Sequence, residues 1–137
     1  MSWNKGSGTR PQLGRPRAQC EYIVFATNGP HDGGSGEVID GFFYCPTERD
    51  RYHITQKPIA LMQELVRLCP LEGVVLDPFC GSASTAVAAI REGRRAITIE
   101  SNEEIERVAR QRLEAESVGL SLSDARTGQT SIFGGST

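Results

Sequence analysis

The chain has 137 residues, a formal net charge of −2 and 38% hydrophobic residues, a composition typical of one globular domain but short for a complete α/β enzyme. No apolar run approaches the ~20 residues of a membrane-spanning helix, and the polar first residues lack a secretory signal, so we expect a cytoplasmic protein without a membrane span. The four cysteines show no C-x-x-C spacing, which favours free thiols over a metal site or a disulfide framework.

The start of the chain is basic, because its first 17 residues include four basic side chains and no acidic one. Glycine, proline and serine are frequent and no apolar period is present, so residues 1–19 are expected to form a basic arm. Composition alone is equally consistent with an arm that contacts DNA phosphates and with a solvated tail. The basic residues are Lys5, Arg10, Arg15 and Arg17.

A folded domain is expected over residues 20–116. It opens with CEYIVFAT, whose β-branched and aromatic residues predict a strand with Tyr22 and Phe25 in the core. The glycine-rich segment that follows predicts a loop, and weak alternation over residues 37–54 predicts a short hairpin.

From Pro58 the apolar residues recur at the i, i+3, i+4 spacing of an amphipathic helix, which Pro70 ends. The run VVLD at residues 74–77 then predicts a short strand of the uniformly apolar kind that is buried on both faces of a parallel sheet. AITIE at residues 96–100 predicts a second strand of this kind.

A helix is predicted on either side of the second strand. The first covers about residues 84–92, with Ser82 or Ser84 as its N-cap. The second opens at the capping-box pattern formed by Ser101 and Glu104. Residues 117–137 show no period and are expected to be a flexible tail.

Strand, helix and strand in this order predict a right-handed βαβ unit, which binds ligands at the carboxyl ends of its strands. Asp77 and Glu100 end the two strands, and Gly81 lets a ligand approach the backbone between them. The loop has one glycine and no lysine, so it is a poor phosphate cradle. A nucleoside without phosphates but with a charged amino-acid tail fits better, and S-adenosylmethionine has this description.

The stretch that runs from HITQKP at residues 53–58 through DPFCGS at 77–82 to Glu100 resembles the cofactor half of the β-class amino-methylating DNA methyltransferases. Members of that family methylate N6 of adenine or N4 of cytosine. The match covers about residues 53–113, and WNK and CEYIVFATNG upstream resemble the strand region before the family's target-recognition segment. A short insert at about 30–52 stands in place of that segment. The resemblance implies a partial Rossmann-like methyltransferase fold, with a parallel sheet flanked by helices.

The resemblance also implies an S-adenosylmethionine site, in which TQKP lines the methionine end and the second acid holds the ribose. The residues expected in this site are Thr55, Lys57, Asp77, Pro78, Phe79, Gly81, Ser82 and Glu100. The four basic residues of the arm become candidates for contacts with DNA phosphates.

Two departures from the family pattern matter. The family usually has glycine where this chain has Ala83, which is expected to place a methyl group toward the cofactor path. The catalytic motif, Asp/Asn/Ser-Pro-Pro followed by an aromatic residue, is absent, because no Pro-Pro occurs in the 137 residues. In the family this motif accepts hydrogen bonds from the amine of the flipped target base. No catalytic residue is therefore assigned, and the base-handling half is expected outside this chain.

The expected function is that of the S-adenosylmethionine-binding half of a site-specific DNA methyltransferase, as in restriction–modification, acting on double-stranded DNA. A partner chain would supply the missing motif, and a homo-oligomer and a truncated gene product are further forms that fit. The alternative function is a non-catalytic module that binds S-adenosylmethionine or DNA. Some other nucleotide-binding α/β protein is a weaker hypothesis, against which TQKP argues.

Overall fold

The computed structural model describes residues 1–6, 13–30, 36, 38–47 and 56–119. In this part of the chain, no helix is long and apolar enough to cross a membrane. The elements in chain order are β1 (Ser2–Asn4), β2 (Cys20–Tyr22), β3 (Phe42–Tyr44), α1 (Ile59–Val66), β4 (Val74–Asp77), α2 (Ser84–Arg91), β5 (Arg95–Thr98) and α3 (Glu103–Ser117).

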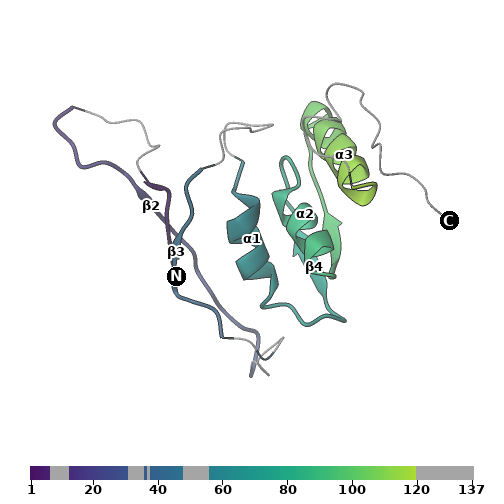
Figure 1. The fold of residues 1–137 in the computed structure, drawn as a ribbon, viewed down its shortest axis with the longest axis horizontal. Helices are drawn as coiled ribbons and strands as arrows, with labels where there is room; N and C mark the ends of the chain where they lie inside the picture. The colour runs from purple at the N-terminus through teal and green to yellow at the C-terminus, as the bar shows by residue number, and fades with distance from the viewer. Residues whose placement is uncertain (7–12, 31–35, 37, 48–55, 120–137) are drawn as a thin grey trace.

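The strands form two separate sheets. β1 is central in the first, antiparallel to β2 and parallel to β3. β4 and β5 form the second and are parallel, with Val74 opposite Arg95 and Asp77 opposite Thr98. Helix α2 connects them, so the predicted βαβ unit is present. Figure 1 shows α1, α2 and α3 side by side in chain order, with β2 and β3 on the far side of α1.

Residues 2–4 belong to the core and not to an arm. Trp3 lies in the central strand with 2% of its surface exposed, and its indole N–H donates to the Cys45 carbonyl at 2.6 Å. The expected core residues of the next strand are instead on the surface, Tyr22 at 87% and Phe25 at 50% exposed. The strand prediction for residues 20–27 is confirmed only at Cys20–Tyr22. These three residues pair with β1, and only one face of the segment is packed against other residues.

Helix α1 packs against both sheets. Leu61 forms one cluster with Trp3 and Phe43 of the first sheet. The opposite side of α1 contributes to a second cluster, against α2 and the parallel sheet, whose buried members are Ile59, Val66, Val87, Ala88 and Ala89. The helical spacing read from the sequence is thus confirmed over Ile59–Val66, with apolar residues packed on two sides, but the helix ends at Val66 and not at Pro70.

The parallel sheet is covered on one face only. Val75 and Ala96 turn toward the helices, as residues packed against the helical clusters. The opposite face carries exposed apolar side chains, with Leu76 at 63% and Ile97 at 57%. The expectation that both strands are buried on both faces is therefore wrong for the described part of the chain. A parallel sheet is normally covered on both sides, so this face is an apolar surface without a partner here.

The residues predicted as N-caps of α2 and α3 both differ from those in the structure. The N-cap of α2 is Ala83, which has no side-chain cap bond, whereas Ser82 and Ser84 are buried beneath the loop. The N-cap of α3 is Asn102, whose side chain accepts hydrogen bonds from the N–H groups of Glu104 and Ile105. Asparagine is among the best N-cap residues, so it takes the place expected for the preceding serine.

The predicted hairpin is also corrected in its described part. β3 pairs in parallel with β1 and not with a neighbouring strand of its own segment. Residues 48–54 lie outside the described residues, and so does the predicted tail from residue 120 onward.

Candidate functional site

The carboxyl ends of β4 and β5 meet through backbone hydrogen bonds. The Ile99 N–H donates to the Asp77 carbonyl at 2.9 Å, and the Cys80 N–H donates to the Ile99 carbonyl at 3.0 Å. The loop after β4 therefore lies against the chain that leaves β5. Asp77 and Glu100, which the sequence placed at the two strand ends, come to the same edge of the sheet.

Glu100 spans this edge. Its Oε2 accepts a hydrogen bond from the Gly81 N–H at 3.0 Å, and its Oε1 accepts one from the Asn102 N–H at 2.9 Å. Gly81 has a φ of 53°, and a Cβ built there would meet no atom within 4 Å. The glycine thus satisfies a left-handed conformation and leaves open space beside the acid.

Asp77 holds the same loop from the other strand. Its Oδ1 accepts from the Phe79 N–H at 3.1 Å, and its Oδ2 accepts from the Thr85 hydroxyl at 2.5 Å. A carboxylate has about four lone-pair sites, so these bonds leave acceptor capacity for a ligand. Phe79 is 88% exposed beside the acid, and Pro78 is exposed as well, so a ring face is open to solvent at this edge.

Ser82 lies beneath the loop and not on its open side. It is 5% exposed, and its hydroxyl donates to the Gln56 Oε1 at 3.3 Å. Arg112 of α3 donates through Nη1 to the Ser82 carbonyl at 2.8 Å and to the Ser84 hydroxyl at 3.2 Å. The side chain of Ser82 therefore supports the loop from within.

Ala83 is the one non-glycine residue with a positive φ in the described chain, at 61°. Its surface is fully buried, in a cluster with Ala86 and Ala109. The expectation that its methyl group faces the cofactor path is therefore wrong, because the methyl packs toward α2 and α3. The left-handed conformation costs about 1–2 kcal/mol for a residue with a Cβ, so the surroundings must hold it.

Lys57 reaches the three-stranded sheet. Its Nζ lies 2.6 Å from a carboxylate oxygen of Glu21 and 5.4 Å from the centre of the Trp3 ring. Lys5 contacts the same carboxylate at 3.2 Å. Burial alone would raise the pKa of Glu21, but the hydrogen bonds and charges of the two lysines outweigh it and lower the pKa. This cluster ties the start of α1 to β1 and β2.

The remaining predicted residues are more scattered. Arg15 and Arg17 are exposed, whereas Lys5 is 18% exposed and paired as described above. Thr55 and Arg10 lie outside the described residues.

A groove of about 410 Å³ lies between β5 and α3. Among the predicted site residues that the structure describes, Glu100 alone lines it. Burial raises the pKa of the Cys80 thiol in this groove, and the charges of Asp77 and Glu100 raise it further, so the thiol stays protonated near neutral pH. The groove lining is Cys80, Thr98, Glu100, Glu106, Ala109, Arg110, Leu113, Glu114 and Ser117. We place the candidate site at the open side of Gly81 and not in this groove, because both acids hydrogen-bond to this loop and Phe79 is exposed on it.

Three supporting residues, Gln56, Thr85 and Arg112, are not among the predicted site residues. Arg112 carried a readable signal, because a cation stands at a position of α3 that shares the buried side with Ala109. Gln56 stands within the TQKP motif and Thr85 lies eight residues from its partner Asp77, but neither local pattern assigns these side chains a partner.

The residues present fit a cationic ligand that carries hydroxyl groups. Two carboxylates, an exposed ring and open space beside a glycine lie at one edge, and the described residues contain no cluster able to hold a metal ion. Carboxylates accept hydrogen bonds from ammonium and hydroxyl groups and repel phosphates. The arrangement therefore favours a nucleoside with a charged amino-acid tail over a nucleotide.

Comparison with known proteins points to DNA methyltransferases. A family model described as DNA methylase matches residues 26–111. The type II methyltransferase M2.DpnII of Streptococcus pneumoniae is 48% identical over 65 residues, and the DNA adenine methyltransferase YhdJ of Escherichia coli K12 is 42% identical over 106 residues, or 73% of this chain. The crystal structure of an M1.HpyAVI–SAM complex aligns with a TM-score of 0.61 and 26% identity over 82% of this chain and 60% of that one.

The chain is much shorter than these relatives. The match covers 24% of M2.DpnII and 36% of YhdJ, so the chain spans roughly a quarter to a third of their length. The family model nevertheless covers more than half of the chain and includes both acids and the loop between them. The fold is that of these methyltransferases, and the chain belongs to the DNA methylase family.

Proposed function

We propose that this chain binds S-adenosylmethionine as the cofactor part of a DNA methyltransferase that acts on N6 of adenine or N4 of cytosine. One observation carries the proposal: Asp77 and Glu100 lie at one sheet edge and both hydrogen-bond to the loop that carries Gly81, beside which the space is open. Family membership and the relation to M1.HpyAVI, solved with SAM, support it.

Each acid has a distinct role in this proposal. Asp77, at the end of β4, pairs with the ammonium group of the methionine moiety, and Glu100 accepts the ribose hydroxyls. Phe79 offers an exposed ring for contact with the bound molecule. When bound, S-adenosylmethionine supplies an activated methyl group, and the role of this chain is to orient it. Pro78, Ser82, Thr55 and Lys57 complete the proposed set. Ser82 acts through the backbone it supports, and Lys57, whose ammonium pairs with Glu21, acts by holding the start of α1.

The test is calorimetric titration of the purified chain with S-adenosylmethionine. The variants Asp77→Asn and Glu100→Gln keep side-chain size and one acceptor oxygen but remove the charge. Each is expected to weaken binding about tenfold or more, since hydrogen bonds to charged groups contribute about 1.5–3 kcal/mol. The matched control is Glu72→Gln, an exposed acid just before β4, at the other end of the strands.

Three outcomes of the titration lead to different conclusions. Loss of affinity in the two site variants, with the control unchanged, supports the cofactor site. A wild-type chain that is folded by circular dichroism and does not bind refutes it. Equal affinity in all four proteins would show that binding occurs elsewhere.

Methyl transfer is proposed to require a further polypeptide segment. No Pro-Pro motif occurs in the 137 residues, so the group that holds the target amine must come from another chain or from additional sequence. The chain alone is expected to transfer no labelled methyl group to duplex DNA. Addition of the part of YhdJ outside the matched region is expected to restore transfer, and nucleoside analysis then identifies the methylated base. Transfer by the chain alone would contradict this requirement.

The name of YhdJ favours adenine as that base. A non-catalytic module that binds S-adenosylmethionine or DNA remains the second candidate, favoured by the same missing motif. Cofactor binding without transfer under any complementation would select it.

A further inference from the structure

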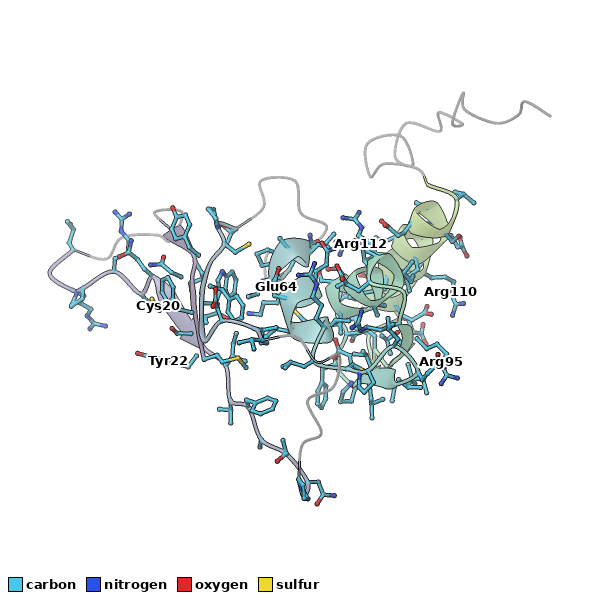
Figure 2. All side chains as sticks on the ribbon, turned by 60° about the horizontal axis from the view of Figure 1, so that its bottom comes forward. Cys20, Tyr22, Glu64, Arg95, Arg110 and Arg112 are labelled. Atoms are coloured by element: carbon cyan, nitrogen blue, oxygen red, sulfur yellow. The ribbon has the colours of Figure 1, made fainter. Side chains whose placement is uncertain are left out.

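The loop that carries the proposed site rests on a buried cation. Arg112 lies in α3 and is 2% exposed, which makes it one of the largest fully buried side chains described. Figure 2 shows Arg112 directed toward the other helices, whereas Arg110 lies on the outer side of α3. A buried guanidinium is costly unless oxygen atoms surround it, so its acceptors fix where it can lie.

The acceptors of Arg112 flank the strained residue of the loop. Its Nη1 lies 2.8 Å from the Ser82 carbonyl and 3.2 Å from the Ser84 hydroxyl, and Ala83 stands between these two serines with a φ of 61°. Strained backbone of this kind persists only where neighbouring groups over-determine it. Arg112 therefore donates hydrogen bonds to the residue before Ala83 and to the residue after it.

The same contact extends to the segment before α1. The Ser82 hydroxyl lies 3.3 Å from Arg112 Nη1 and donates to Gln56 Oε1 at 3.3 Å. Arg112, Ser82 and Gln56 therefore link α3, the loop and the start of α1 through one buried set of hydrogen bonds. All three residues are buried.

The strained turn at Ala83 also sets the position of the open side of the loop, where the ligand is proposed to bind. The Ala83 N–H donates to the Cys80 carbonyl at 2.8 Å, and Gly81, between them, donates to Glu100. A turn at Ala83 that relaxed would shift the Gly81 N–H away from the carboxylate. The buried face and the open face of the loop are thus coupled over residues 80–84.

We propose that Arg112 is a positioning residue, which holds residues 82–84 in the strained turn that keeps Gly81 and Glu100 in register for cofactor binding. The inference rests on the proposed function for its affinity readout but not for its structural readout. Arg112 does not touch the ligand, because it is buried on the opposite side of the loop. Arginine suits the role because the two N–H groups of Nη1 have fixed directions in the guanidinium plane and can reach a carbonyl and a hydroxyl together, whereas a lysine ammonium rotates freely.

The test compares Arg112→Met with a matched buried arginine. Arg94 is 8% exposed and donates to the carbonyls of Cys69 at 2.8 Å and Glu92 at 2.7 Å, at the end of the parallel sheet where β5 begins. Arg94→Met therefore removes a buried cation of the same kind away from the loop. Arg112→Lys is the conservative variant, and it also serves if Arg112→Met does not fold.

Three quantities are measured on each folded variant: the thermal midpoint, the exchange rates of the Gly81 and Ala83 amides, and the dissociation constant for S-adenosylmethionine well below the midpoint. Both Met variants are expected to lower the midpoint. Only Arg112→Met is expected to accelerate exchange at both amides and to weaken binding about tenfold or more, since small displacements of a site are costly. Arg112→Lys is expected to fall between Arg112→Met and the wild type.

Wild-type exchange rates and affinity in Arg112→Met or, if that variant is unfolded, in Arg112→Lys would overturn the inference. Equal changes in Arg94→Met would overturn it too, by showing a general effect of destabilisation. A wild-type chain that binds no S-adenosylmethionine refutes the proposed function, and the exchange rates then still decide the role of Arg112.

Discussion

Glu100 accepts a hydrogen bond from the backbone N–H of Gly81 at 3.0 Å, so a carboxylate that follows β5 closes the loop that follows β4. The same carboxylate accepts the Asn102 N–H at 2.9 Å, just before α3 begins. One side chain thus organises both segments that leave the parallel sheet. A residue expected from sequence to hold a ligand also holds the site together.

Removal of this carboxylate is expected to cost stability. Glu100→Ala leaves two backbone N–H groups without their acceptor, and we expect the free energy of unfolding to fall by about 1–2 kcal/mol, because water replaces part of what is lost at a half-buried site. Urea unfolding and the exchange rate of the Gly81 amide measure the effect. Glu72→Ala is the control, and parallel behaviour of the two variants would contradict the prediction.

Position 83 is expected to accept glycine and reject branched side chains. Ala83→Gly relieves the left-handed strain but loses a buried methyl group, so the net change in the free energy of unfolding is expected to stay within about 1 kcal/mol. Ala83→Val keeps the strain, adds β-branching and overfills a fully buried position, and should cost more than about 2 kcal/mol. Thermal and urea unfolding compare the two, and a tolerated valine would show that the turn is not constrained.

Acid is expected to weaken the contact between α1 and the chain after α2. Hydrogen bonds from Arg67 and Gln63 hold the pKa of Glu92 below its ordinary value of 4.5. Because the folded pKa is lower than the unfolded one, Glu92 stabilises the fold above the ordinary value and loses this contribution as the pH falls through the folded pKa. Urea unfolding from about pH 7 to about pH 3 should therefore show a flatter acid decline for Glu92→Gln.

Arg67→Met removes the main partner of Glu92, which lies 3.0 Å away, and should flatten the decline in the same way. The double variant should add little to either single change, because both act on one interaction. Profiles parallel to that of the wild type would show that this pair does not contribute to the acid sensitivity.

The exposed face of the parallel sheet is expected to tolerate charge. Leu76→Lys and Ile97→Lys alter side chains that are 63% and 57% exposed, so the free energy of unfolding should change by less than about 0.5 kcal/mol. Self-association measured by sedimentation should decrease, because an apolar patch is removed. Leu61→Lys, at a position 4% exposed, is the contrasting control and should unfold the chain.

Contacts with DNA are expected to come from Arg15 and Arg17, which are exposed, and not from Lys5, whose side chain is 18% exposed. Loss of both Arg15 and Arg17 to alanine should weaken duplex binding and reduce the salt slope by about 2, roughly one unit for each phosphate contact. Lys5→Ala should leave the slope unchanged, because its ammonium is engaged with Glu21 at 3.2 Å. Fluorescence anisotropy at several salt concentrations provides the slopes, and an unchanged slope in the double variant would remove the arm from the DNA-binding surface.

Local patterns predicted the second half of the chain well. VVLD at residues 74–77 coincides with β4, and the helix expected over about 84–92 is Ser84–Arg91. These elements carry strong local patterns, an apolar run or a helical period between turn formers, and such patterns suffice to locate them. The first half was harder, because β1 is three residues long and is followed by a polar, glycine-rich stretch that hides its strand pattern.

The sequence by itself determined the βαβ unit, the two acids that end its strands and the family to which these motifs point, since each depends on residue type and local order. Tertiary structure alone decided that Trp3 enters the core, that one face of the parallel sheet stays exposed, and that Arg112 lies beneath Ser82 and Ser84. The physical reason is that burial and hydrogen bonding between distant segments depend on how helices and sheets pack, and 30 residues separate Arg112 from Ser82.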